Sequence, residues 1–318
     1  MTMLTEEALA GIRLLVCMAK ADGVLTPDER YALEDALAGF DLPDDITIDT
    51  LLKEKQDPLQ LAQCIKTPEG RDYAYASVFA LAYCDRNLSS QEERILVALR
   101  EAWGINPEED VALKSALDAG HSKEHHSTSY HAPIKTAEER QAAFERLLLR
   151  YSILTGITGA IPIPVVPDLL VIPIQVKMVY DVAHLFGQKT NKETVQLMFE
   201  TFGVGTGARI GITALCKMVP GWGSVVGAAS SFATTYALAK VAYTYFKSEG
   251  RESMESLKPM FQQERVSGRL TYQKHEAALQ EAHKSHAETL KQLAYDLQHG
   301  RITQKAYEQQ IDKLGEEK

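Results

Sequence analysis

The sequence predicts an all-α protein with several domains, and three observations lead to this fold class. Apolar residues recur at three-and-four spacing over most of the first 120 residues, which is the pattern of amphipathic helices. No stretch of useful length alternates apolar and polar residues as a half-buried strand does. The 318 residues also exceed the length at which one hydrophobic core stops growing, so about two or more domains are expected.

Charge divides the chain into regions. Residues 1–120 carry 11 Lys and Arg against 23 Asp and Glu, whereas residues 151–246 carry only 6 basic and 4 acidic groups. Residues 247–318 carry 12 of each. We predict an acidic helical domain over residues 1–120, a Ser-, Thr- and His-rich linker over 121–137, an apolar helical domain over 138–247 and a helical tail over 248–318.

The net charge of −9 comes without a basic stripe, so the phosphate contacts that dominate nucleic-acid affinity are missing and we exclude nucleic-acid binding. The acidic first residues differ from a secretory signal, and the cysteines form no CxxC pair. Both observations are typical of a cytoplasmic protein. Each cysteine is therefore interpreted as a small buried hydrophobic residue. The four are Cys17, Cys64, Cys84 and Cys216.

The first domain is predicted to hold a duplicated helix pair. Helical periodicity covers residues 4–21, 28–40, 73–84 and 91–103. Residues 19–29 recur as residues 82–92 at a constant offset of 63. In each copy an apolar helix leads into an Asp-led turn, which is followed by a hydroxyl residue at the start of the next helix and a Glu in its first turn.

Two interpretations of these turns remain open. Thr26 with Glu29, and Ser89 with Glu92, each have the spacing of a capping box. In this motif the hydroxyl and the carboxylate accept hydrogen bonds from backbone N–H groups that have no partner within the helix. The Asp of each turn instead follows a helix C-terminus, where the macrodipole disfavours an anion unless a cation is near or the side chain caps the turn.

If the two turns come together, their carboxylates would form an oxygen cluster suited to a hard divalent cation such as Ca²⁺, Mg²⁺ or Mn²⁺. The candidate ligands are Asp22, Glu29, Asp85 and Glu92.

The KADG pattern at residues 20–23 with Glu29, and its second copy, resemble the TerB family of tellurite-resistance-associated helical domains over about residues 5–118. The resemblance implies an all-helical, pseudo-duplicated fold with acidic residues of these turns in metal binding, and a link to metal and envelope stress. The second copy carries Arg86 where the pattern has Gly, which puts a basic group beside Asp85.

The apolar domain is long enough to reach a membrane. Residues 151–176 contain one charged side chain, Asp168, but also four prolines, which favour an interfacial segment or a buried hairpin over a straight span. Glycines at four-residue spacing, from Gly203 and from Gly223, allow close helix packing in a membrane or in a buried helix pair, and both alternatives stay open.

Residues 140–247 resemble the family that includes YcjF-type bacterial inner-membrane proteins and that follows some GTPase domains. The resemblance implies a helical, often membrane-linked module without an established reaction. For its polar positions we expect helix-packing roles. These positions are Asp168, Gln175, Lys177, Asp181 and His184.

The tail contains a second repeat, since residues 267–279 recur as residues 299–311. In each copy a Gly is expected to end one helix and a Thr, Thr271 or Thr303, to cap the next. The second copy resembles the SHOCT-type C-terminal helical hairpin. We expect the tail to mediate interactions, including assembly into a homo-oligomer.

The sequence contains no recognisable combination of a nucleophile, a general base and oxyanion-stabilising donors. We therefore expect a protein that is not an enzyme. The favoured function is a stress-associated bacterial adaptor that binds a divalent cation through the first domain and the inner membrane or a membrane protein through the apolar domain. The alternative is a soluble protein–protein interaction module, such as a GTPase partner, in which the acidic turns only cap helices.

Overall fold

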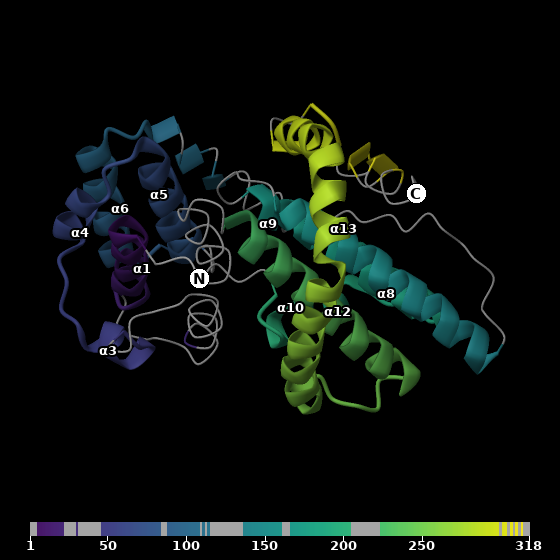
Figure 1. Cartoon of the computed structure of the whole chain (residues 1–318). Coiled ribbons are helices and arrows are strands. Elements are labelled where there is room, and N and C mark those ends of the chain that lie inside the picture. Colours follow the sequence, from purple (N-terminus) through teal and green to yellow (C-terminus); the bar gives the residue numbers. More distant parts are fainter. Residues whose placement is uncertain are drawn as a thin grey trace. The chain divides into compact units, whose positions relative to one another are not determined.

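The structure is a computed structural model of the whole chain, shown in Figure 1. It describes residues 5–21, 30, 46–83, 88–108, 110–111, 113–114, 136–160, 166–204, 223–298, 301–303, 306–307, 309–310 and 313. Within these residues every regular element is a helix and none is a strand, which confirms the predicted all-α class.

The chain divides into two compact units, and each is described by itself. The helices of the first unit are α1 (Glu6–Ala19), α3 (Ile48–Lys53), α4 (Pro58–Cys64), α5 (Pro68–Ala82) and α6 (Ser90–Trp103). The second unit contains α8 (Ala137–Gly159), α10 (Lys192–Thr201), the short 3-10 helix η1 (Glu255–Leu257), α13 (Lys258–Gln298) and all but the first residues of α9 (Val166–Leu185) and α12 (Gly223–Lys247). The four-part domain division stays a prediction.

Helix α1 occupies the middle of the first unit, in contact with α3, α4 and α5 (Figure 1). Leu14, Leu15 and Met18 are at most 1% exposed. Helix α5 packs against α1 and buries every residue from Ala74 to Ala82. The predicted helix over residues 4–21 is therefore confirmed, whereas most of the one over 28–40 lies outside the described residues.

A single carboxylate joins the starts of α1 and α5. Glu7 accepts hydrogen bonds from the backbone N–H of Lys66 at 3.0 Å, from the backbone N–H of Thr67 at 3.2 Å and from Thr67 Oγ1 at 2.6 Å. Thr67 Oγ1 in turn caps α5 by accepting from the Gly70 N–H. The Glu7 carboxylate thus stabilises the N-terminus of a helix some sixty residues away.

Helix α6 packs on α4 and α5. The indole N–H of Trp103 donates to the carbonyl of Ala62 at 3.1 Å. The buried Tyr75 hydroxyl donates to Asp110 at 2.5 Å, and Arg100 pairs with the other oxygen of the same carboxylate. Burial, followed by the hydrogen bond to Asp110, raises the pKa of Tyr75 far above its ordinary value.

Helix α12 lies at the core of the second unit. Its side chains from Phe232 to Ala242 include seven apolar residues with no exposed surface. Phe144 of α8 stacks at a tilt on Tyr243, with ring centroids 4.2 Å apart. No described helix combines the length and the apolarity that crossing a membrane requires.

Small residues set the helix spacing in this unit. A Cβ added at Gly156 of α8 would lie 3.5 Å from Phe232, an ordinary contact. A Cβ added at Gly268 of α13 would lie only 2.8 Å from the Ala233 Cα, so α13 and α12 touch backbone to backbone at this point. The glycine is required by the approach of the two helices.

Four buried or partly buried threonine hydroxyls of the second unit bond within their own helices. Thr155, Thr158, Thr234 and Thr235 each donate to the carbonyl one turn earlier. Gln175 of α9 also donates to Thr235 Oγ1 at 2.9 Å, which links α9 to α12. Without these bonds the hydroxyl groups would lack hydrogen-bond partners in the apolar core. With them, burying the hydroxyl groups costs little free energy.

Helix α9 contains two of the four prolines of the apolar segment. It begins at Val166, so Pro167 falls in the first turn, where a missing N–H costs nothing. Pro173 lies inside the helix, which nevertheless continues to Leu185. Pro162 and Pro164 lie outside the described residues.

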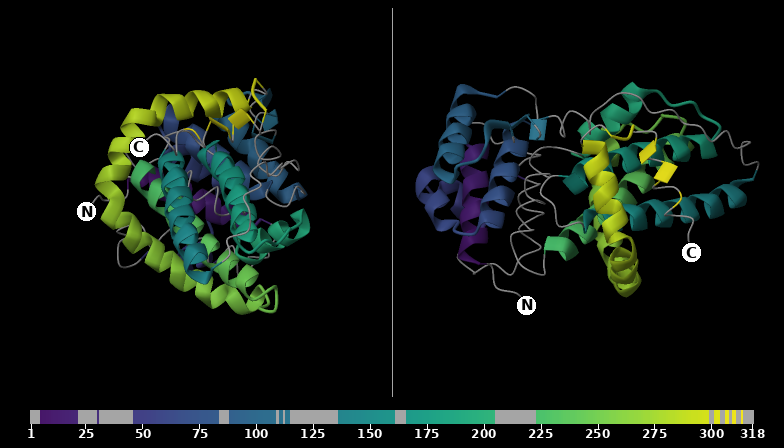
Figure 2. Two further views of the ribbon diagram at one scale, coloured as in Figure 1. Left: turned by 90° about the vertical axis from the view of Figure 1, so that its right-hand side faces the viewer. Right: turned by 90° about the horizontal axis from the view of Figure 1, so that it is seen from above.

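The first copy of the tail repeat differs from its prediction. Gly268 and Thr271 lie inside α13, which runs without interruption from Lys258 to Gln298 and bends around the outside of the unit (Figure 2). Thr271 donates to the Ser267 carbonyl at 2.9 Å and caps nothing. The predicted helix stop is wrong because packing against Ala233 outweighs the low helix propensity of one glycine, about 1 kcal/mol.

The second copy behaves as predicted at its cap. Thr303 Oγ1 accepts from the Ala306 N–H at 3.2 Å, and the Tyr307 N–H donates to the Thr303 carbonyl at 3.0 Å. Tyr307 is fully buried, with its hydroxyl 3.5 Å from the Leu170 carbonyl of α9. Tyr307 therefore packs against α9.

Candidate functional site

The predicted metal ligands are described only in part. Asp22, Glu29 and Asp85 lie outside the described residues. Glu92 lies in the first turn of α6, where its Oε2 accepts from the Ser89 N–H at 2.8 Å while Ser89 Oγ accepts from the Glu92 N–H at 3.2 Å. The capping box predicted for the second copy is thus confirmed. In the described part of the chain, no three or more His, Cys, Asp or Glu side chains lie close enough together to hold a metal ion.

The described helices fix where the chain enters the two acidic turns. Because Glu7 binds the start of α5, and because α1 and α5 lie side by side, the two helices run in the same direction. They contain 14 and 15 residues, so their C-terminal ends at Ala19 and Ala82 lie at the same end of the unit. Asp22 and Asp85 follow each of these ends by three residues.

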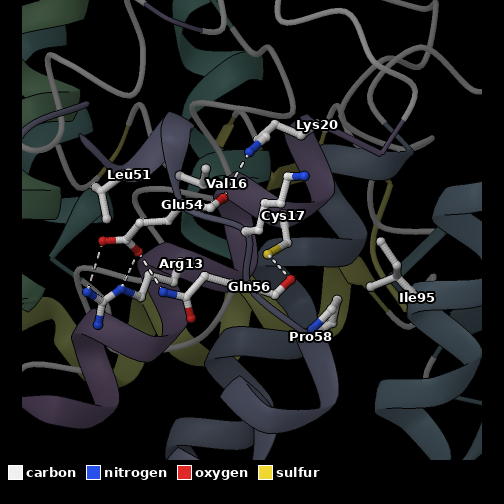
Figure 3. Close-up of a pocket in the computed structure, with 10 residues that line it drawn as sticks. Arg13, Val16, Cys17, Lys20, Leu51, Glu54, Gln56, Pro58 and Ile95 are labelled. Atoms are coloured by element: carbon white, nitrogen blue, oxygen red, sulfur yellow. Dashed lines mark hydrogen bonds and ion pairs between the residues drawn. The ribbon is translucent and has the colours of Figure 1, made fainter. Parts of the chain in front are cut away.

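A pocket of about 310 Å³ lies on another face of α1, between this helix, α3, the segment that joins α3 to α4, and α6 (Figure 3). The described residues that line it are Arg13, Val16, Cys17, Lys20, Leu51, Glu54, Lys55, Gln56, Pro58 and Ile95. Figure 3 shows the Arg13–Glu54 pair on one side and Pro58 and Ile95 on the other, with Cys17 between them.

A bidentate ion pair between Arg13 and Glu54 forms one side of the pocket. Arg13 Nε and Nη2 donate to the two carboxylate oxygens of Glu54 at 2.9 and 3.2 Å. Gln56 Nε2 also donates to Glu54, at 2.6 Å. The hydrogen bond from Arg13, against an opposing contribution from burial, holds the pKa of Glu54 below its ordinary value. Glu54 is therefore ionised and held in place at neutral pH.

Lys20 lines the pocket at the C-terminal end of α1. Its ammonium donates to the carbonyls of Leu52 at 2.7 Å and Glu54 at 3.1 Å. These carbonyls belong to the C-terminal end of α3, where a cation is favourable. Two of the three ammonium protons are thus bound to backbone.

Cys17 contributes a thiol to the pocket. Its sulfur lies 3.7 Å from the Gln56 carbonyl, and burial raises its pKa, although Lys20 acts in the opposite direction. The thiol is therefore protonated at neutral pH. Cys17 is half-buried and Cys64 is exposed, so the prediction of buried cysteines is wrong for Cys64. Cys84 and Cys216 lie outside the described residues.

The pocket is basic although its domain is acidic. Three of the 11 basic residues of residues 1–120 line it, against one of the 23 acidic residues. The sequence contained a signal for it, because Arg13, Cys17 and Lys20 have the spacing of one helical face. Lys55 comes from a separate segment, and its position depends on the packing of α3, which periodicity did not predict.

Polar residues of the second unit form a smaller cluster. The Tyr151 hydroxyl donates to Asp181 at 2.5 Å and accepts from Lys177 at 2.8 Å, while Lys177 also pairs with Asp181 at 3.0 Å. The cluster ties α8 to α9 and agrees with the expected helix-packing roles of Gln175, Lys177 and Asp181.

Comparison of the chain with protein-family models, curated proteins and solved structures gave no match. The resemblances to the TerB, YcjF-type and SHOCT-type families therefore stay predictions from sequence motifs.

Proposed function

We propose that the protein is a non-enzymatic adaptor. The first unit binds a divalent cation, and the second unit attaches to the inner-membrane surface or to a membrane protein. One observation supports the cation site above all. Helices α1 and α5 run in the same direction, so both end at the same end of the unit, each shortly before an Asp-led turn.

A cation at this end would solve an electrostatic problem. The C-terminal ends of two parallel helices carry partial negative charge, and each turn adds an aspartate. Ca²⁺, Mg²⁺ or Mn²⁺ would offset both the helix ends and the carboxylates of Asp22 and Asp85. Glu29 and Glu92 would complete the ligand set, with Glu92 still using Oε2 for its cap.

The outer surface of α13 supports the docking role of the second unit. Val266 and Leu270 lie one helical turn apart and are 61% and 56% exposed. Seven apolar residues of α12 between Phe232 and Ala242, in contrast, have no exposed surface. Attachment through exposed side chains of the outer helices is therefore favoured over insertion of the core helices.

Thermal unfolding of the full chain tests the cation site. We expect Ca²⁺, Mg²⁺ or Mn²⁺ to raise the melting temperature relative to EDTA, because a ligand of the folded state stabilises it. The double variant Asp22→Asn with Asp85→Asn should lose this increase, whereas Glu101→Gln, an exposed position of α6, should keep it. Equal melting of the wild type in EDTA and in all three cations would refute the site.

Binding to inverted inner-membrane vesicles tests the docking role. We expect the full chain to sediment with the vesicles, and the double variant Val266→Ser with Leu270→Ser to bind at least several-fold less. Leu197→Ser, which changes an exposed leucine of α10, is the matched control. Protease treatment of the vesicles separates a lipid surface from a membrane protein, and no sedimentation in either case would contradict this half of the proposal.

The Ser89–Glu92 capping box favours a second candidate, a protein–protein interaction module without a metal role, such as a GTPase partner. In this case the acidic residues cap helices and present a negatively charged docking surface. Co-purification of a GTPase with the full chain should then be equal in EDTA and in Mg²⁺ and should weaken in high salt, because screening reduces contacts between exposed charges. A strict requirement for the cation would count against this candidate.

A further inference from the structure

We propose that the basic pocket of the first unit binds a small monocarboxylate with an apolar body. This site goes beyond the proposed function, because it uses Arg13, Lys20 and Lys55 and requires no cation. None of its residues belongs to the predicted metal ligands.

Charge selects an anion. The three basic residues of the pocket face one acidic residue, Glu54, which leaves a formal excess of two positive charges among the described lining residues. The two bonds from Arg13 to Glu54 use Nε and Nη2, and the backbone carbonyls use two protons of Lys20. Nη1 of Arg13, the third proton of Lys20 and the exposed ammonium of Lys55 remain as donors.

The other walls select an apolar body. Pro58 and Ile95 line the side of the pocket away from the Arg13–Glu54 pair, and Val16 and Leu51 also contribute apolar surface to it. A volume of about 310 Å³ is at the lower end of small-molecule sites and has room for about ten water-sized groups. A ligand of this size places one charged end on the lysines and a short hydrocarbon portion on the aliphatic side chains.

The fixed Glu54 carboxylate argues for a single negative charge on the ligand. Its pairing with Arg13 and Gln56 holds it at the pocket wall, where it would repel the additional charge of a phosphate dianion or a dicarboxylate. A monocarboxylate gains from the lysines with less of this repulsion. The aliphatic walls also offer a phosphate group nothing to bind.

Hexanoate tests the site directly, with hexylamine and hexan-1-ol as ligands of the same body and different charge. Equilibrium dialysis of the full chain in EDTA should show one equivalent of bound hexanoate and neither of the other two. EDTA separates this result from the cation proposal. The variant Lys55→Gln should weaken hexanoate binding about tenfold, the loss of roughly one charge-assisted hydrogen bond.

The matched control is Lys53→Gln, which removes a nearby exposed lysine that does not line the pocket and should leave binding unchanged. Lys55→Arg should retain most of the affinity, because it keeps the charge. No hexanoate binding, equal binding of hexylamine, or an equal loss in Lys53→Gln and Lys55→Gln would overturn the proposal.

Two cysteines provide an independent readout in the same protein. Cys17 lines the pocket, whereas Cys64 is exposed and does not. Bound hexanoate should slow the alkylation of Cys17 by iodoacetamide several-fold and leave Cys64 unchanged, as measured by peptide mass spectrometry. Equal slowing of both cysteines, or of neither under conditions where dialysis shows binding, would place the ligand elsewhere and contradict the assignment.

Discussion

The two units fix their helices by different means. In the first unit, charged side chains reach across to another helix or to its backbone, as Glu7 does at the start of α5 and Lys20 at the end of α3. In the second unit, small residues let helices approach closely, as Gly268 does against Ala233, and polar links such as the bond from Gln175 to Thr235 and the Tyr151–Lys177–Asp181 cluster add to this packing.

The difference has a physical consequence for each unit. Contacts made by ionised groups depend on pH and salt, and they leave polar surfaces and pockets where the long side chains converge. Contacts made by small residues depend on shape alone, because a densely packed interior tolerates little added volume. The two candidate ligand sites both lie in the first unit.

The largest expected effect tests the shape-dependent packing of the second unit. Gly268→Leu should destabilise this unit by about 3 kcal/mol, because even a Cβ would lie 2.8 Å from the Ala233 Cα. Hydrogen exchange followed by mass spectrometry measures the loss in α12 and α13 separately from the first unit. Val266→Leu, at an exposed position of the same helix, should change stability by less than about 0.5 kcal/mol.

A smaller loss is expected where the first unit also requires a glycine. A Cβ at Gly70 would lie 2.6 Å from Thr67 Oγ1 and 2.9 Å from the Glu7 carboxylate. Gly70→Ala should therefore cost about 1–2 kcal/mol, less than Gly268→Leu because these are side-chain atoms that can move. Chemical denaturation gives the value, and Glu69→Ala at the exposed neighbouring position is the control. A stabilised Gly70→Ala would show that helix propensity outweighs the contact.

Acid should destabilise the first unit more than the second. Burial opposes ionisation of Glu7, but the hydrogen bonds from the Thr67 hydroxyl and the backbone outweigh it and lower the pKa of Glu7 below 4.5, and Arg13 lowers that of Glu54. A lowered pKa in the folded state contributes stability above the unfolded value, and this stability is lost as the pH falls through the folded value.

Amide exchange of α1 and α5 should therefore accelerate, after correction for intrinsic rates, below about pH 4.5, more than that of α12. Glu7→Gln should reduce this dependence, whereas Glu6→Gln, at an exposed position, should not. Equal acceleration in both units would remove the proposed distinction between charge-dependent and shape-dependent packing.

Sequence patterns predicted the parts of the fold that depend on local signals. The all-α class, α1 and the Ser89–Glu92 capping box follow from spacing along the chain, and the structure confirms them. The short helices α3 and α4 were missed because six or seven residues carry too little periodicity. The basic pocket was missed because Lys55 meets Arg13 and Lys20 only after these helices pack.

The tail repeat shows the same limit within one motif. Both copies contain a Gly followed three residues later by a Thr, and both were predicted to interrupt a helix. Packing of Gly268 on α12 keeps the first copy helical, whereas Thr303 of the second copy caps a turn as predicted. Tertiary contact, which a single sequence does not reveal, decides between the two outcomes.

The smallest expected effects test whether each threonine of the repeat acts as a helix cap. Thr303→Ala should remove the cap on the Ala306 N–H and cost about 1 kcal/mol, seen as faster exchange in residues 301–313. Thr271→Ala should cost almost nothing or be slightly stabilising, because Thr271 caps no helix and alanine has the higher helix propensity. Equal losses in the two variants would mean that the first copy also requires its threonine as a cap. A loss confined to Thr303→Ala would show that only the second copy uses its threonine as a cap, although both copies share their Gly, Arg and Thr positions.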